Sequence, residues 1–316
     1  EIASCLVGSE MCIRDSYMTP QIDNFLVDAL HTFQVRTLRS LGFGTRVSLT
    51  NKSQEKPKYA SKYQVNLTVY APNGQIEKSL SDVARLDLGE TVLLECRQWE
   101  LDDGQDRILI FHLIPERLLP ELGTDRTIST SREEIWSLFT AQDHYVEYYR
   151  EDGFASGVLY QSGAFNYRKF SAEASTLIQA PKVCISSNTT TLLSLMHTSF
   201  EPGYDRTAAL NYILMDTQAN IVVRDSVSVR PFETLLIDFS EVLSKAGGAK
   251  QHASADMNFY TLYAVCQNAS LLPLILNRNI AAATLSVEHS LPPMYYGQSL
   301  FGQARAQAVS YTHLRA

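Results

Sequence analysis

Residues 63–74, YQVNLTVYAPNG, decide the fold class of this chain. The apolar residues at positions 63, 65, 67 and 69 alternate with Gln64, Asn66, Thr68 and Tyr70. Such alternation places one set of side chains on the core face of a strand and the other set toward solvent. The tripeptide Pro-Asn-Gly follows at 72–74, and Asn and Gly tolerate the positive φ of a tight turn. The stretch therefore predicts a β-strand and the turn of an antiparallel hairpin.

The chain contains this pattern twice. The first copy, YASKYQVNLTVYAPNGQIEK, starts at position 59, and the second, YDRTAALNYILMDTQANIVV, starts at position 204. When the two are aligned, their apolar residues coincide at one constant offset. After a gap of two residues, GETVLLEC (89–96) aligns with FETLLIDF (232–239), which places Glu90 on Glu233. The repetition of a whole strand-turn-strand pattern is typical of a duplicated domain.

Further short runs of alternating or apolar residues, separated by turn residues, follow each copy of the repeat. Regular short strands of this kind are typical of antiparallel sandwiches, whereas the alternating βα units of Rossmann and TIM folds are missing. We therefore predict a mainly β protein with two tandem antiparallel β-sandwich repeats, immunoglobulin-like or jelly-roll-like. The expected boundaries are 17–122 for the first sandwich and 171–308 for the second, and we expect the two to dock on each other.

Two segments show helical spacing instead. In IDNFLVDALHTF (22–33) the apolar residues form one stripe at a helical period, which predicts a helix at the start of the first sandwich. Between the repeats, Ser131 and Glu134 fit a capping box, and Val146 and Tyr149 continue an apolar stripe behind it. We therefore expect residues 123–170 to form a helical, aromatic-rich connector.

The two ends of the chain are related as DNA. GSEMCIRDS (8–16) and VSYTHLRA (309–316) can be back-translated into one DNA segment read on its two opposite strands. That segment resembles the mosaic end of a transposase-based sequencing adapter. We therefore expect residues 1–16 and 309–316 to be adapter read-through that contributes nothing to the fold. The remaining insert would then be a fragment from a metagenomic sample.

Composition excludes several classes of function. The formal net charge is −7 and no Lys/Arg cluster is visible, which is a poor match to nucleic acid or an anionic membrane. No apolar run reaches the roughly 18 residues of a membrane span. Outside the adapter-like ends, Cys96, Cys184 and Cys266 are too widely spaced for a disulfide framework or a zinc site, so we expect buried apolar thiols. No cofactor motif is present, and we expect neither a metal nor a cofactor.

The most unusual local composition is HYVEYYREDGFASGVLYQSGAFNYRKF (144–170). Tyrosine combines an apolar ring with a polar tip, which suits the surfaces of sugars and peptides. The alternative is that these rings pack the connector onto the second sandwich. A second candidate is ATLSVEHSLPPMYYG (283–297), in which a histidine follows the end of a strand. The candidate ligand-binding residues are Tyr145, Tyr148, Tyr149, Tyr160, Tyr167 and His289.

Two weaker candidates are better explained by structure alone. His289 and His197 could share a metal only if the fold made them neighbours, and a satisfied structural histidine is the simpler interpretation. The acidic loop WELDDGQDR (99–107) does not have the spacing of a calcium loop, so its carboxylates are expected to be solvated at a hairpin tip.

Three functions remain open at this point. The leading hypothesis is a non-enzymatic binding or structural protein that recognises a glycan or a protein surface. The second is a glycan-active hydrolase with an acid/base pair of carboxylates at the inter-domain cleft. The third is a structural assembly subunit. A duplicated sandwich without paired cysteines favours a secreted or bacterial-envelope location, by analogy at the level of the fold.

Overall fold

The computed structural model describes residues 22–29, 31–51, 62–101, 103–131, 142–159, 175–248 and 256–289. Within these ranges the protein is mainly β, with several antiparallel sheets and one short α-helix, α3 (Phe239–Leu243). The adapter-like ends, 1–16 and 309–316, lie outside the described residues. No helix in the described ranges is long and apolar enough to cross a membrane.

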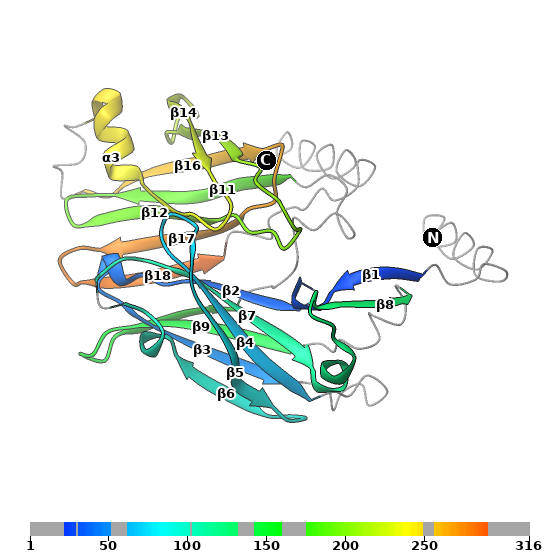
Figure 1. Ribbon diagram of the computed structural model, residues 1–316. Helices are drawn as coiled ribbons and strands as arrows, with labels where there is room; N and C mark the ends of the chain where they lie inside the picture. Colours follow the sequence, from blue (N-terminus) through cyan, green and yellow to red (C-terminus); the bar gives the residue numbers. More distant parts are fainter. Residues whose placement is uncertain are drawn as a thin grey trace, which may run out of the picture.

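Four four-stranded antiparallel sheets carry most of the strands (Figure 1). Sheet 1 has the order β2 (Thr32–Arg36), β7 (Ile108–Pro115), β4 (Tyr63–Tyr70) and β5 (Ile76–Leu86). Sheet 2 has the order β10 (Ala155–Leu159), β9 (Gln142–Tyr149), β3 (Gly44–Asn51) and β6 (Thr91–Glu95). Sheet 3 has the order β11 (Thr176–Ile185), β16 (Asn258–Cys266), β13 (Ala208–Met215) and β14 (Ile221–Val229). Sheet 4 has the order β15 (Thr234–Asp238), β12 (Thr189–Met196), β17 (Leu272–Asn279) and β18 (Thr284–His289).

The smaller elements lie at the ends of these strands. β1 (Ile22–Leu26) and β8 (Thr127–Ser131) form a separate two-stranded ribbon. The remaining elements are short helical turns: η1 (Val27–Ala29), η2 (Arg39–Leu41), η5 (Cys96–Gln98), η6 (Glu116–Glu121) and η7 (Ser244–Gly248).

The strand order of the first pair of sheets is repeated in the second pair. In sheets 1 and 3 the strands follow one another in the same relative order, and the same holds for sheets 2 and 4. The aligned residues Glu90 and Glu233 also make the same local contact. The backbone N–H of Asp87 donates to Oε2 of Glu90 at 2.8 Å, and that of Arg230 donates to Oε2 of Glu233 at 3.0 Å. The alignment of the two stretches thus corresponds to equivalent positions in the structure.

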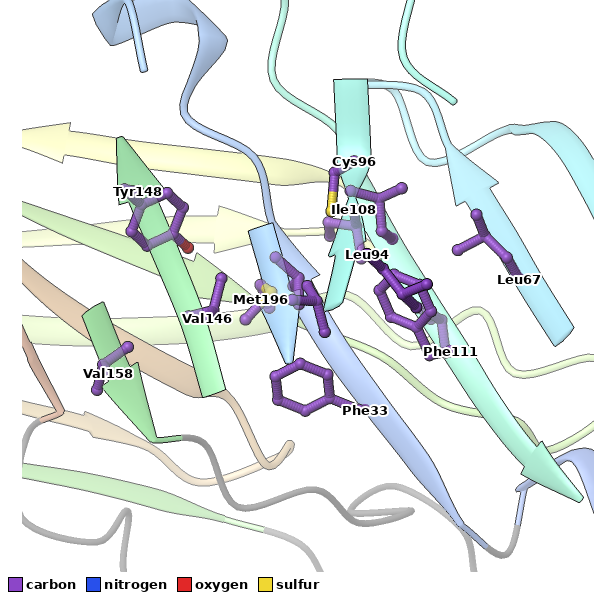
Figure 2. Close-up of a cluster of buried hydrophobic side chains, with 14 of the residues drawn as sticks. Phe33, Leu67, Leu94, Cys96, Ile108, Phe111, Val146, Tyr148, Val158 and Met196 are labelled. Atoms are coloured by element: carbon purple, nitrogen blue, oxygen red, sulfur yellow. The ribbon is translucent and has the colours of Figure 1, made fainter. Parts of the chain in front are cut away.

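Sheet 4 lies between the other sheets and contacts both sheet 1, through Arg36, and sheet 2, through Ser156 of β10. Figure 1 shows sheet 4 between sheet 3 on one side and sheets 1 and 2 on the other. Leu193 and Leu195 of β12 point into the core shared with sheet 3, whereas Leu192 and Met196 belong to the larger core built mainly by sheets 1 and 2. Figure 2 shows Met196 among the buried side chains of that larger core. Because β12 is buried on both faces, its sequence TTTLLSLM lacks the polar/apolar alternation of a strand with one solvent face.

Buried polar contacts also join the two pairs of sheets. The guanidinium of Arg36 donates to Asp106 at 2.8 Å, and both side chains are only 4% exposed. The same guanidinium reaches across to the backbone carbonyl of Leu235 and to Oγ of Ser194 in sheet 4. A buried cation that donates to groups in both halves is expected to couple their folding, because its removal would leave these groups buried without a hydrogen-bond donor.

The turn at Gly74 contributes to the same interface. Gly74 has φ +83°, and an ideal Cβ built there would lie 2.6 Å from the backbone oxygen of Pro231. The neighbouring Asn73 forms an isolated β-bridge with Glu233. The hairpin turn expected from the Pro-Asn-Gly tripeptide is therefore also a contact with the second half, and only glycine permits both roles.

Replacement of Gly74, compared with that of another glycine, should separate the cost of the left-handed backbone from the cost of the contact with Pro231. We expect Gly74→Ala to lower the free energy of unfolding by roughly 2–3 kcal/mol, since it adds left-handed strain and a clash with backbone. Gly104→Ala is the matched control, because Gly104 has φ +70° but nothing within 4 Å of its Cβ position. It should cost only about 1 kcal/mol. Equal losses for the two variants in urea denaturation would exclude the contact with Pro231.

The helix expected over residues 22–33 is absent. This segment forms β1, the turn η1 and the start of β2. Phe25, Val27 and Ala29 are all buried, at every second position, and β1 pairs with β8. In so short a window the apolar residues fit both a helical and a two-residue period, and pairing with a distant strand decides between them.

The helical connector expected over residues 123–170 is also wrong where the structure describes it. Ser131 ends β8, and residues 142–149 form β9, which pairs with β3 and β10. Residues 132–141 and 160–170 lie outside the described residues. Val146 and Tyr149, expected on one helical stripe, lie on opposite faces of the strand. The β-branched and aromatic residues of HYVEYY favour a strand once a neighbouring strand is available.

Tyr70 differs from its expected exposure. The burial of β4 follows the predicted alternation through residue 69, but Tyr70 is only 8% exposed. Its ring stacks on Phe232 of the second half with centroids 4.1 Å apart, and burial raises its pKa to about 12. A contact with a residue more than one hundred positions away cannot be read from local alternation.

His144 gives the stability a pH dependence. Its ring is buried against Phe33 at 4.7 Å, and neither ring nitrogen has a hydrogen-bond partner among the described residues. Burial lowers the pKa of His144 to about 3. The unfolded chain therefore takes up the proton first, so this contribution to stability is lost as the pH falls from about 6.5 toward 3.

The prediction compares the pH dependence of stability in the wild-type protein and in a variant without the ionisable ring at position 144. We expect His144→Phe to remove roughly 2 kcal/mol of the stability that the wild-type protein loses between about pH 6.5 and pH 4.5. Chemical denaturation at a series of pH values measures it. Parallel pH profiles for the two proteins would show that His144 is not the group responsible.

Candidate functional site

The outer face of sheet 2 holds the tyrosines that the sequence singled out. Strand β9 alternates strictly: Val146 and Tyr148 point into the larger core, as Figure 2 shows, and Tyr145 and Tyr149 point outward. This face is the candidate binding face, made by outward residues of β10, β9, β3 and β6. It combines aromatic rings with charged groups on a regular sheet.

Tyr145 lies across a glycine of the neighbouring strand. Gly157 is on β10, and an ideal Cβ there would be 2.1 Å from Cζ of Tyr145. Any side chain at 157 would therefore displace the ring. Tyr145 stays 38% exposed in this position. A ring that covers backbone on one side presents its other side to solvent.

Tyr149 occupies the equivalent arrangement on the other side of β9. An ideal Cβ at Gly44 of β3 would be 2.6 Å from Cζ of Tyr149. The hydroxyl of Tyr149 donates to Oε2 of Glu95 at 2.7 Å. Partial burial, and then the bond to Glu95, raises the pKa of Tyr149. This ring is therefore fixed at both ends, by contact with backbone and by its hydroxyl.

Arg46 connects the charged groups of the face. On β3, it lies opposite Glu147 of β9 and Glu95 of β6. Its guanidinium donates to Oε1 of Glu147 at 3.0 Å and also binds Glu95, and its Cζ is 4.0 Å from the centroid of the Tyr149 ring. The hydrogen bond to Glu95 is the main cause of the raised pKa of Arg46. The network holds two carboxylates and an aromatic ring in fixed positions before any ligand arrives.

The other predicted site residues are not part of this face. Tyr148 is fully buried and its hydroxyl donates to the backbone carbonyl of Arg36 at 2.8 Å, so it is unavailable to a ligand, contrary to the prediction. Tyr160 and Tyr167 lie outside the described residues. His289 is the last residue of β18, where it pairs with Leu274, and its side chain lies outside those described.

His197, considered from the sequence together with His289 as a metal ligand, has a structural role. The ring of His197 is buried, within hydrogen-bond distance of the carbonyl of Val229 at 3.1 Å and of the hydroxyl of Tyr204 at 3.0 Å. Burial lowers the pKa of His197 to about 4, so the ring is neutral near pH 7. In the part of the chain that the structure describes, no group of three or more His, Cys, Asp or Glu could hold a metal ion.

The acidic loop is a solvated hairpin tip only in part: residues 103–105 are exposed, but two of its carboxylates, Glu100 and Asp106, are buried. Asp106 is buried and accepts bonds from Arg36 and Ser40, and Asp103 accepts two bonds from the buried guanidinium of Arg107. Glu100 lies 3.4 Å from Arg39 with its side chain only 2% exposed, and burial raises its pKa to about 7. These groups organise the loop between β6 and β7. Glu100 and Asp106 are too deeply placed to meet a substrate in their present positions, whereas Asp103 is partly exposed but is held by Arg107.

Sequence reasoning found the tyrosines and missed their partners. Gly44 and Arg46 on β3 and Glu95 on β6 lie far from β9 in the chain, whereas Gly157 is on β10, the next strand after β9. Only pairing of the strands brings them together. A signal was present in the glycines, because glycine inside a strand often marks a place where another group approaches the backbone closely.

No protein-family model matches the chain, and no curated protein sequence matches it. Among solved structures, it is similar to parts of a glycosyl hydrolase family 2 member from Bacteroides cellulosilyticus, with 9% identity over 84% of this chain and 27% of that one, at a TM-score of 0.16. A β-glucuronidase from Bacteroides uniformis gives 12% identity over 81% and 25%, at 0.18. The β-D-glucuronidase of Dictyoglomus thermophilum gives 9% identity over 85% and 37%, at 0.18. The chain thus spans well under half of each of them, and at these TM-scores the likeness carries no argument.

Proposed function

We propose that this is a non-enzymatic binding protein, built from a duplicated β-sandwich of immunoglobulin-like or jelly-roll-like type, that holds a glycan on the outer face of sheet 2. The observation that carries the proposal is the position of Tyr145, whose exposed ring covers Gly157. The shared strand order of the two pairs of sheets supports the duplication.

The chemistry of the face suits a sugar. A sugar ring has an apolar face of C–H groups and a rim of hydroxyls, so it is matched by an aromatic ring with hydrogen-bonding groups beside it. Tyr145 offers the ring, and Glu147 and Arg46 offer an acceptor and donors one position away on the same face. Because ion pairs already hold these groups, little side-chain entropy is lost when a ligand binds.

The test removes only the ring. We expect Tyr145→Ala to weaken glycan binding at least tenfold in isothermal titration, because it deletes the stacking surface. Tyr145→Phe should bind within about threefold of the wild-type protein, since it keeps the ring. The control is Ile76→Ala, which removes an apolar residue from β5 that is more exposed than Tyr145 (61% against 38%).

The outcomes are distinct. Binding by wild-type protein and by Ile76→Ala, with loss in Tyr145→Ala, supports the proposal. If Tyr145→Ala retains full affinity while its thermal melting is unchanged, the glycan does not use this face. If a broad panel of plant, bacterial and animal polysaccharides yields no binding to wild-type protein, the glycan class itself is wrong.

The hydrolase hypothesis requires a carboxyl of raised pKa within a cleft. Glu100 has the raised pKa, but its side chain is buried beside Arg39. On the candidate binding face, Glu95 and Glu147 each already accept a hydrogen bond from the Arg46 guanidinium, so both carboxylates are engaged within the protein. A binding function therefore fits the described residues better than an enzyme does.

A further inference from the structure

The outer face of sheet 3 is hollowed where the equivalent face of sheet 1 is covered. In sheet 1, the ring of Phe200 packs on His112 at 5.6 Å and Thr198 donates to Gln34, so residues of the second half close that face. The register of the strands places Val265 of β16 where His112 lies in β7. His112 is 7% exposed, whereas Val265 is 37% exposed.

Two hollows lie side by side on this open face. The first has a volume of about 620 Å³ and the second of about 320 Å³, and Tyr263 lines both. These volumes fall in the range of small-molecule sites. Two adjoining hollows that meet at one aromatic ring favour an extended ligand of several units over a single compact one.

The larger hollow combines apolar and polar groups. Ile213, Val265 and the Tyr263 ring supply apolar surface, and Asn211 and Ser226 supply an amide and a hydroxyl. The lining also includes the backbone of β13 and β16. An extended peptide would more readily add to a sheet edge, where backbone groups are free, than lie across the face of paired strands. A chain of sugar rings fits this surface better.

The charge of the ligand follows from Arg224. This residue of β14 is exposed and lines the larger hollow, and its side chain makes no hydrogen bond or ion pair within the described residues. Its neighbour Asp225 is already engaged, since it accepts from the hydroxyl of Tyr212 at 3.1 Å and from the backbone N–H of Ser226 at 2.7 Å. Arg224 and Tyr263 lie on either side of Ile213 on the same face of the sheet. A guanidinium that has no partner among the described residues is matched by a carboxylate, and the ring offers a second point of contact to the same ligand.

We propose that the hollowed face of sheet 3 binds an acidic oligosaccharide, with a uronate carboxylate on Arg224 and a sugar ring on Tyr263. This site is separate from the candidate binding face of sheet 2 and carries its own ligand requirement. A molecule with both would hold glycan on two different sheets.

The experiment compares acidic probes with their neutral forms. Oligosaccharides of polygalacturonate, hyaluronan and alginate, each also as its carboxyl methyl ester, are titrated calorimetrically into the wild-type protein, Arg224→Gln, Tyr263→Ala and the control Arg85→Gln. Arg85 is an exposed arginine on β5, far from sheet 3. We expect at least one acidic probe to bind, with affinity reduced about tenfold by Arg224→Gln, by Tyr263→Ala and by esterification, but not by Arg85→Gln.

The same titrations separate this proposal from the one for sheet 2. Tyr145→Ala should leave the acidic-probe affinity that depends on Arg224 unchanged. If Tyr145→Ala abolishes it and Arg224→Gln does not, the acidic glycan lies on sheet 2 and the site on sheet 3 is refuted. Equal affinity for the acid and ester forms, or no binding by any acidic probe, also overturns the proposal.

Discussion

Arg36→Leu should lower the free energy of unfolding by about 3–5 kcal/mol, because it leaves Asp106 buried without its cation. Among the described residues, Asp106 would keep only its hydrogen bonds from Ser40, whose backbone N and Oγ each lie 2.8 Å from a carboxylate oxygen of Asp106. The carbonyl of Leu235 and the hydroxyl of Ser194 would lose their donor from the first half at the same time. Urea denaturation of the whole chain measures the loss.

The control for this variant is an exposed pair. Arg85 forms a salt bridge with Asp82 at 2.8 Å, with side chains 63% and 41% exposed. Because solvent screens such pairs, Arg85→Leu should change stability by less than about 1 kcal/mol. A loss for Arg36→Leu no larger than that of Arg85→Leu would mean that the buried Arg36 guanidinium and its bonds to Leu235 and Ser194 do not stabilise the protein as argued.

Leu274→Ala and Ile275→Ala should destabilise the same unfolding transition by about 2–5 kcal/mol each. Both residues lie on β17 and are fully buried, but Leu274 packs into the larger core and Ile275 into the core between sheets 3 and 4. Since sheet 4 contributes to both cores, the loss of either contact should lower the stability of both halves together. Differential scanning calorimetry distinguishes this from independent units.

The contrary result is specific. Independent halves would give two transitions, and Ile275→Ala would shift only one of them. A single transition that moves with both variants supports two halves that unfold together through the shared sheet 4.

Local sequence patterns predicted the main features of the fold. The alternation in residues 63–69 matches the buried positions of β4, and the aligned Glu90 and Glu233 occupy the same turn. Both features depend on neighbours within a few residues, so both can be inferred from the local sequence. Antiparallel sheets repeat such local units, so the mainly β fold could be inferred without knowing the contacts.

The errors arose where distant strands decide. Residues 22–29 and 142–149 have apolar spacings that fit a helix, and only the partners β8, β3 and β10 make them strands. Tyr70 is buried by Phe232, which comes from the other half. In each case a long-range contact outweighed a weak local preference.

The candidate site shows the same division. Composition alone drew attention to Tyr145 and Tyr149, but the same argument selected Tyr148, which faces the core. Alternation within the strand separates them once the segment is known to be a strand. The ion pairs of Arg46 could not be predicted, because they require the register of three strands that are distant in the chain.

Hydroxyl-radical footprinting with and without a bound glycan tests the central claim most directly. In the free protein, Tyr145 should be modified and Tyr148 should not, because their exposed fractions are 38% and 0%. At a saturating concentration of a glycan that binds, we predict that modification of Tyr145 falls several-fold while exposed residues such as Ile76 react as before. Unchanged modification of Tyr145 under saturation would contradict a glycan site on the outer face of sheet 2.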